Sequence, residues 1–363
     1  MAQRNSGDAA ASGLPDVIAP NFKRRLSGVT STIVQLIPAQ RAAGLSIAAF
    51  GPGLPETVAR MRYRDLVRLW KRPADRRFRV WHARRNTEIV GGLILRDVLR
   101  MPIRIVFTSA SQRRHKRFTK WLIARVDAVI STSHKTAAYL ERSSTVIHHG
   151  IDLDRFHPPA DRAAAKKAVG LSPGSKIVGC FGRIRRQKGT DLFAEALFAP
   201  LRAMPDWIAI IAGRTTAEHK GFEAELRAHI AGEGLSDRIL FVGEHRDIER
   251  WYQALDLFIA PQRWEGFGLT PLEAMACGVP VIATDVGAFS ELIVEGETGH
   301  ILRDLEAATM RAASERLMHD DTRRTKMGVD ARRHVEAAFS LEREVRQLNA
   351  VYDSVAAGIE FGL

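Results

Sequence analysis

Four charged residues in the second half of the chain have types and spacings suited to a ligand that is both phosphate and sugar. Glu265 and Glu273 lie eight positions apart, and Arg183 and Lys188 lie five positions apart in a basic loop. Carboxylates accept hydrogen bonds from sugar hydroxyls, whereas Arg and Lys neutralise phosphate oxygens. The two pairs together indicate a binding site for a sugar that carries phosphate.

The two carboxylates occupy a predicted strand–loop–helix–strand unit. Residues 255–261 and 279–283 are apolar runs of strand length, and a glycine-containing loop between them leads into a short helix. Thr270 is the predicted N-cap of that helix, with Pro271 at its first position. A loop and a helix N-terminus that present backbone amides at one point bind anions. The amides expected to meet ligand oxygens are those of Phe267, Gly268, Leu269 and Thr270.

A structural role for Glu273 is an open alternative. Thr270 to Glu273 fit a capping box, in which Glu273 accepts a hydrogen bond from the N-cap amide. Glu265 precedes the glycines and caps nothing. The sequence leaves both roles of Glu273 possible.

The basic loop follows a strand predicted over residues 176–181. Gly182 opens it, Arg183 and Lys188 lie within it, and a helix follows from Gly189. A glycine-containing turn between a strand and a helix suits a phosphate group. The loop is not a Walker A motif, and the chain lacks a Gly-x-Gly-x-x-Gly motif, which argues against ATPases and dehydrogenases.

These motifs resemble those of the retaining, nucleotide-sugar-dependent glycosyltransferases of family 4, also called glycosyl transferases group 1. Glu265 and Glu273 match the Glu-x7-Glu motif, and Arg183 and Lys188 match the Arg-x4-Lys pair. The resemblance implies that Arg183 and Lys188 grip the donor pyrophosphate and that Glu265 holds sugar hydroxyls. It also implies that Glu273 accepts from the ribose hydroxyls. Glu265, Arg183 and Lys188 are thus the expected catalytic residues, with Gly182 beside them in the donor site.

Strands alternate with helices along the whole chain, which predicts α/β domains with parallel, doubly wound sheets. The resemblance implies a GT-B fold, with two Rossmann-like domains facing a central cleft. We expect an acceptor-side domain over 1–157, a donor-binding domain over 158–340, and a last helix over 341–363 that crosses back to the first domain. The helices expected in the first domain cover about residues 31–43, 56–71, 86–100, 112–125 and 133–141.

The acceptor half matches the family less well than the donor half. Many relatives carry a Thr-x-His after the fourth strand, but here the His position corresponds to Ala110. His115 and His82 are the candidate substitutes. Gly28 is the one glycine where relatives often have two, and we expect it to contribute to the donor site.

No cofactor or metal is expected. Many transferases hold a metal with an Asp-x-Asp motif, but here Asp152-Leu153-Asp154 lies in the predicted linker. Arg183, Lys188 and helix-terminal amides are able to neutralise the departing diphosphate instead. The neighbouring His148 and His149 suggest a metal, but a third ligand is lacking.

The positive charge is concentrated in the first domain. The chain carries a net charge of +13, and residues 60–125 hold 20 Lys and Arg against four Asp and Glu. Such a patch calls for an anionic partner, and we expect an anionic membrane surface. Trp70 and Trp121 lie among these cations as interfacial anchors, with core packing the alternative for at least one. A nucleic-acid partner is not expected, because neither interleaved aromatics nor a recognised binding module is present.

The chain as a whole resembles the bacterial lipopolysaccharide core mannosyltransferases. This resemblance implies transfer of mannose from GDP-mannose, with retention, to a lipopolysaccharide core or similar glycolipid. The expected location is cytoplasmic and peripheral, on the inner leaflet of the cytoplasmic membrane. The alternatives are transfer to a different acceptor, a GT-B epimerase or phosphorylase, and a basic nucleic-acid-binding protein.

Overall fold

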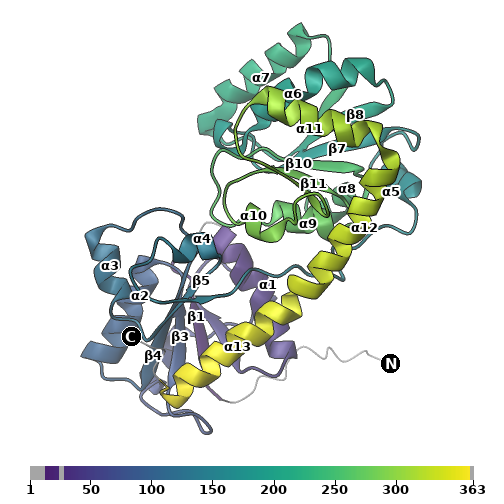
Figure 1. Ribbon diagram of the computed structural model, residues 1–363. Coiled ribbons are helices and arrows are strands. Elements are labelled where there is room, and N and C mark those ends of the chain that lie inside the picture. Colours follow the sequence, from purple (N-terminus) through teal and green to yellow (C-terminus); the bar gives the residue numbers. More distant parts are fainter. Residues whose placement is uncertain (1–12, 24–27, 360–363) are drawn as a thin grey trace.

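The computed structural model describes residues 13–23 and 28–359 of the chain. Within these ranges the chain forms two α/β domains, each built on a parallel sheet with helices around it (Figure 1). The predicted α/β class with two parallel sheets is confirmed. The start of the chain, where no signal peptide is expected, lies mostly outside the described residues.

Six parallel strands form the first sheet of the described chain, in the order β2-β1-β3-β4-β5-β6. They are β1 (Val17–Pro20), β2 (Ile47–Phe50), β3 (Arg79–Ala83), β4 (Ile103–Ser109), β5 (Ala128–Ser131) and β6 (Thr145–Val146). The central strands are buried on both faces, which is why they read as continuous apolar runs in the sequence. Ala83 pairs with Phe107, so the residues that follow β3 and β4 lie side by side at one edge.

The described part of the second sheet also has six parallel strands, in the order β12-β11-β10-β7-β8-β9. They are β7 (Lys176–Phe181), β8 (Trp207–Ala212), β9 (Ile239–Gly243), β10 (Leu257–Ala260), β11 (Val281–Thr284) and β12 (Gly299–Leu302). Phe258 packs into one core cluster, and Leu257 and Ile259 pack into another on the opposite face. Because β7 and β10 are neighbours, the loops that follow them lie together.

Most helices of the first domain are shorter than the sequence predicts, although α1 begins earlier than expected. They are α1 (Gly28–Ala42), η1 (Tyr63–Arg68), α2 (Asn86–Leu93), the π-helical turn η2 (Ile94–Val98), α3 (Arg117–Ile123) and α4 (His134–Ala137). A continuous helix over 56–71 is wrong. Ala49 donates to Ala59 O and Met61 donates to Ala49 O, so residues 59–61 extend the edge of β2, and the helical part of this range is the short η1. The helix expected from 112 begins only at Arg117, because a cluster of cations opposes the positive N-terminal end of a helix dipole.

Ten helices of the second domain lie within the described residues. They are α5 (Arg162–Ala168), η3 (Arg186–Lys188), α6 (Thr190–Ala203), η4 (Ala217–His219), α7 (Lys220–Gly232), α8 (Ile248–Gln253), α9 (Thr270–Ala276), α10 (Phe289–Leu292), α11 (Ala307–His319) and α12 (Asp321–Ala338). The predicted domain boundary at 157/158 falls in the irregular segment before α5.

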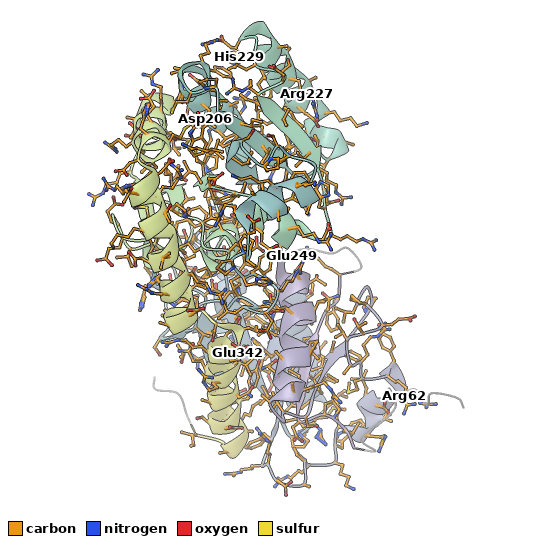
Figure 2. All side chains as sticks on the ribbon, turned by 90° about the vertical axis from the view of Figure 1, so that its right-hand side faces the viewer. Arg62, Asp206, Arg227, His229, Glu249 and Glu342 are labelled. Atoms are coloured by element: carbon orange, nitrogen blue, oxygen red, sulfur yellow. The ribbon has the colours of Figure 1, made fainter. Side chains whose placement is uncertain are left out.

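The last helix, α13 (Leu341–Ala357), crosses from the second domain to the first (Figure 1). Its apolar face joins the core cluster that contains β1, β2 and α1 residues, with Leu348 and Tyr352 buried among them. In Figure 2, Asp206 and His229 mark the second domain, Arg62 marks the first, and Glu342 lies on the crossing helix. The Ile151 amide donates to Phe339 O at 2.8 Å, and the Leu341 amide donates to Ile151 O at 3.0 Å.

A methyl group at Gly150 should destabilise this crossing. A Cβ there would lie 2.4 Å from Ser340 O and 2.7 Å from Leu341 Cα, and neither backbone atom is able to move alone. We expect Gly150→Ala to lower the free energy of unfolding by about 1–3 kcal/mol, measured by urea denaturation. Gly174→Ala is the matched control, because a Cβ there has no neighbour within 4 Å. Equal urea midpoints for both variants would contradict this prediction.

Candidate functional site

A cavity of about 310 Å³ lies between the two domains. Residues from both carboxyl-terminal sheet edges line it, where ligands of open parallel sheets bind. The first domain contributes Thr32, Arg84, Thr108, Ala110 and His149. The second domain contributes Lys188, Glu265, Gly266, Phe267, Gly268, Leu269 and Thr270.

Lys188 and Glu265 meet in this cavity as an ion pair. Lys188 ends η3 after β7, and Glu265 lies in the loop after β10, so the adjacency of the two strands brings them together. Gly189 follows in the left-handed conformation at φ +72°, and a Cβ on it would lie 1.8 Å from Pro261 O. Each side chain of the pair is only 18% exposed, which strengthens the attraction compared with a surface pair.

The loop before α9 presents backbone to the cavity. Gly268 has φ +89°, and a Cβ on it would lie 2.2 Å from the Phe289 ring, so glycine is required there on two counts. Thr270 begins α9, and its Oγ1 is buried without a partner among the described residues. A free hydroxyl beside helix-terminal amides is suited to ligand oxygens.

Glu273 does not form the predicted capping box. Leu269 precedes the helix and makes no side-chain cap, and the Glu273 amide donates to Leu269 O at 3.0 Å. The Glu273 carboxylate instead accepts a hydrogen bond from the Tyr252 hydroxyl at 2.7 Å. Burial raises the pKa of Glu273, while the Tyr252 hydrogen bond acts in the opposite direction. The capping interpretation and the N-cap role of Thr270 are therefore wrong.

Arg183 lies apart from the Lys188–Glu265 pair. It is exposed and, with Arg185, lines a neighbouring cavity of about 330 Å³. No hydrogen bond or ion pair joins its side chain to another residue in the described chain. Gly182, before it, lies close to the end of β8, because a Cβ on Gly213 would lie 1.9 Å from Gly182 O. The Arg183 cation therefore has no protein partner in the described chain.

Neither predicted substitute for the family histidine reaches the cavity. Ala110 lines it, as the motif alignment implies, but His82 is buried behind Thr108 and donates to or accepts from Thr108 Oγ1 at 2.7 Å. Burial lowers the pKa of His82 well below its usual value. His115 is not among the lining residues. His149 is, and its Nδ1 lies 2.8 Å from Glu344 Oε1.

The remaining predicted residues are placed as follows. Gly28 begins α1, and Thr32, one turn later, lines the cavity. His148 and His149 are held apart by different carboxylates, since His148 Nε2 lies 2.9 Å from Glu291. No group of three or more His, Cys, Asp or Glu suited to a metal occurs among the described residues.

The sequence did not indicate that Thr32, Arg84, Thr108 and His149 line the cavity. Arg84 and Thr108 lie at the carboxyl ends of β3 and β4, which is the general location of ligand sites in parallel sheets. Applied to the predicted strands, that rule would have identified Arg84 and Thr108. His149 had no comparable signal, because its carboxylate partner lies 195 positions away.

Because Glu273 is hydrogen-bonded to Tyr252 and does not cap α9, its substitution should affect ligand binding and not lower stability. Burial raises the pKa of Glu273, so above that pKa the charged carboxylate destabilises the folded state. Glu273→Gln removes this cost and should leave the urea midpoint equal or higher. Binding of a nucleoside diphosphate, measured by calorimetry, should weaken by about tenfold or more, because a charged hydrogen-bond acceptor is lost. Exposed Glu297→Gln is the control. Unchanged affinity in the Glu273 variant would show that this carboxylate serves Tyr252 alone.

Comparisons with known proteins agree with this geometry. Residues 161–334 match the family described as glycosyl transferases group 1. The chain is 59% identical to the lipopolysaccharide core biosynthesis mannosyltransferase LpsB of Rhizobium meliloti, over 94% of this chain and 97% of that protein. It is 53% identical to the lipopolysaccharide core biosynthesis mannosyltransferase LpcC of Rhizobium leguminosarum, over 94% and 96% of the two chains.

Solved structures share the two-domain arrangement. Anabaena HepE in complex with UDP superimposes with a TM-score of 0.77 over 93% of this chain and 99% of its own, at 19% identity, which speaks for the fold alone. The carboxyl-terminal domain of the group 1 protein LpcC of Francisella tularensis covers 53% of this chain at 34% identity, with a TM-score of 0.51. Sequence identity over nearly the full length and the two facing domains lead to one conclusion: the chain belongs to the group 1 glycosyltransferases and has their GT-B fold.

Proposed function

We propose that this enzyme transfers mannose from GDP-mannose, with retention, to a lipopolysaccharide core or a similar glycolipid. Two relatives that span more than nine-tenths of the chain are named for lipopolysaccharide core mannosyl transfer. The observation that carries the proposal is the Lys188–Glu265 pair at the mouth of the anion-binding loop, between the two domains.

The donor end of the cavity has the groups that breaking a glycosyl–phosphate bond requires. Departure of a nucleoside diphosphate develops negative charge on its oxygens and leaves an oxocarbenium-like sugar. Lys188, Arg183 and the amides before α9 supply fixed positive charge for the leaving group, and we propose that no metal is needed. Glu265 orders Lys188 before the donor arrives and accepts from sugar hydroxyls when the donor is bound.

The acceptor end lies against the first domain. Thr32, Thr108 and His149 offer hydrogen-bonding groups there, and Arg84 adds a positive charge. The backbone of Ala110 approaches the glycine loop so closely that a Cβ on Gly266 would lie 2.8 Å from Ala110 O. We propose that an acceptor hydroxyl enters from the first domain and reaches the face of the sugar that the diphosphate leaves, as retention requires.

The basic surface of the first domain would hold the enzyme on an anionic membrane. Trp70 is 50% and Trp121 is 48% exposed, so the core-packing alternative is wrong for both. Val98 on η2 and Phe118 on α3 are 70% and 57% exposed. No helix within the described residues combines the length and apolar content that a membrane span requires. Exposed aromatic rings among cations are typical of peripheral binding, and we propose the cytoplasmic leaflet as the surface.

Transfer should depend on the Glu265 carboxylate. We expect Glu265→Gln to reduce kcat by a factor on the order of 10² or more, because it loses charge contacts to Lys188 and to the sugar. The assay measures radiolabelled mannose transferred from GDP-mannose to lipopolysaccharide core that lacks it, in the presence of EDTA.

The control variant tests the site assignment, and the EDTA tests whether transfer needs a metal. Glu297→Gln, an exposed acid of the same domain, should retain full activity. Near-normal turnover of Glu265→Gln would overturn the site assignment. Loss of wild-type activity in EDTA would show that Arg183 and Lys188 do not carry the leaving-group charge alone.

Membrane binding should depend on the cations before and within α3. Reversing four exposed residues to Glu, namely Arg113, Arg114, Lys116 and Arg117, should abolish sedimentation with phosphatidylglycerol-containing liposomes. Each contributes about 1 kcal/mol near an anionic surface. Nucleotide binding should not change.

A matched control reverses four exposed cations of the second domain, namely Lys220, Arg311, Arg316 and Arg323. This control should still sediment. Sedimentation of the α3 variant at the wild-type level, or equal wild-type binding to neutral liposomes in high salt, would rule out the proposed docking surface.

A further inference from the structure

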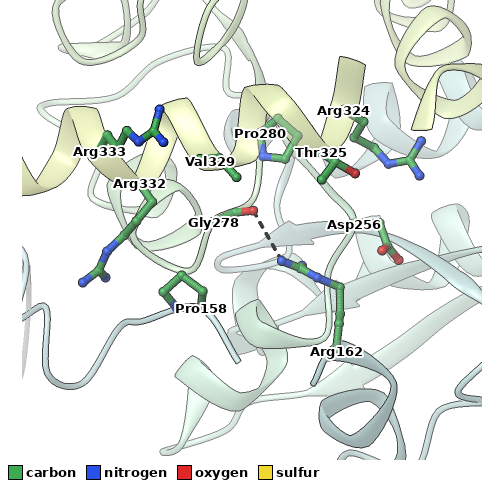
Figure 3. Close-up of a pocket in the computed structure, with 10 residues that line it drawn as sticks. All are labelled: Pro158, Arg162, Asp256, Gly278, Pro280, Arg324, Thr325, Val329, Arg332 and Arg333. Atoms are coloured by element: carbon green, nitrogen blue, oxygen red, sulfur yellow. Dashed lines mark hydrogen bonds between the residues drawn. The ribbon is translucent and has the colours of Figure 1, made fainter. Parts of the chain in front are cut away.

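A second cavity, of about 410 Å³, lies on the opposite edge of the second sheet from the donor site (Figure 3). Asp256 and Pro280, which line it, immediately precede β10 and β11, whereas the donor residues follow the carboxyl ends of β7 and β10. Arginines from α5 and α12 form much of its wall. The cavity is therefore separate from the transfer site.

The charge of the lining residues is strongly positive. Four arginines line the cavity, namely Arg162, Arg324, Arg332 and Arg333, against one carboxylate, Asp256. That carboxylate is already occupied, because its Oδ2 accepts from Lys166 Nζ at 2.7 Å and from the Ile177 amide at 2.7 Å. One carboxylate, shared with Lys166, therefore leaves the four arginines with excess positive charge.

Two of the four arginines combine a close carboxylate partner with backbone hydrogen bonds. Arg324 pairs with Asp321 at 2.7 Å and donates to Leu317 O at 2.7 Å. Arg332 pairs with Glu336 at 2.6 Å and also donates to Phe156 O and Ala276 O, each at 2.8 Å. Arg324 and Arg332 therefore fix the position of α12 over the cavity.

The guanidinium of Arg162 is only partly hydrogen-bonded. Its Nη2 donates to Gly278 O at 3.3 Å, the contact drawn in Figure 3, but its Nη1 is buried and has no partner among the described residues. Burial lowers the pKa of this guanidinium, and Asp256 opposes that effect. A buried donor without an acceptor costs free energy, as does a buried charge that a shared counterion compensates only in part. An anion in the cavity would remove both penalties.

We propose that this cavity binds a small phosphate-bearing anion, held by Arg162 from inside and by Arg333 at the mouth. The planar guanidinium fork suits phosphate oxygens. The Arg333 side chain is 74% exposed and its nearest carboxylate, Asp330, lies 3.5 Å away, which leaves it free to swing toward a ligand. The site lies between α12 and Pro158 in the interdomain segment, so a bound anion would link the two.

Pyrophosphate is a suitable probe if the donor site is disabled first. In a background of Arg183→Gln and Lys188→Gln, calorimetry should still detect pyrophosphate binding. Adding Arg162→Gln should weaken that binding by about tenfold or more, since a charge-assisted hydrogen bond to the anion is lost. Arg311→Gln, an exposed arginine of α11, should leave the affinity unchanged.

Stability measurements separate a ligand site from a structural arginine. Without pyrophosphate, Arg162→Gln should unfold at a higher urea concentration than its parent, because the excess positive charge and the unsatisfied Nη1 donor are gone. Arg333→Glu, which is exposed and should fold normally, provides a second test and should weaken pyrophosphate binding several-fold. Wild-type pyrophosphate affinity in Arg162→Gln or in Arg333→Glu would overturn the proposal, as would the absence of binding in the donor-disabled background.

Discussion

The arrangement of the two domains depends on the hydrogen bonds that the buried Glu344 carboxylate makes. It lies on the first turn of α13, accepts from the Gly150 amide at 2.7 Å, and lies 2.8 Å from His149 Nδ1. Only 6% of its side chain is exposed, so losing either partner would leave a charge poorly solvated in the interior. This tie fixes the interdomain segment against the helix that leaves the second domain.

The same helix also supports the wall of the transfer site. The Tyr352 hydroxyl lies 2.6 Å from His82 Nδ1, and His82 Nε2 lies 2.7 Å from Thr108 Oγ1, which lines the cavity. A hydrogen-bonded chain therefore runs from the final helix, through the core of the first domain, to the acceptor side. Because Tyr352 and His82 are buried and each member is paired, the chain tolerates little displacement, and the cavity wall keeps its shape.

Contacts across the cleft hold the domains from the other side. Glu291 on α10 accepts from the His134 and Lys135 amides at 2.8 and 2.9 Å and contacts His148, and these contacts keep the pKa of Glu291 below its usual value despite burial. Lys135 forms an ion pair with Asp285. The carboxylates of the second domain thus match cations and amides of the first, and the two halves of the site face each other at a defined separation.

The sequence by itself determined the elements that carry the donor chemistry. Apolar runs of strand length identified β7 and β10, and the loop residues Lys188, Glu265 and Gly268 were predicted from local patterns, because a phosphate-binding turn is encoded within a few residues. The motif spacing alone did not show that Lys188 and Glu265 pair with each other. That pairing follows from the strand order, which places β7 beside β10.

Only the tertiary structure decided the partners of residues far apart in sequence. Glu273 matched a local capping pattern, yet Tyr252, 21 positions away, provides its hydrogen bond. Residues 56–71 have helical periodicity, but the backbone of β2 offers Ala59 and Met61 hydrogen bonds that a helix would not replace. Local propensities amount to fractions of a kcal/mol per residue, whereas an unpaired buried polar group costs more, so long-range hydrogen bonding decides such cases.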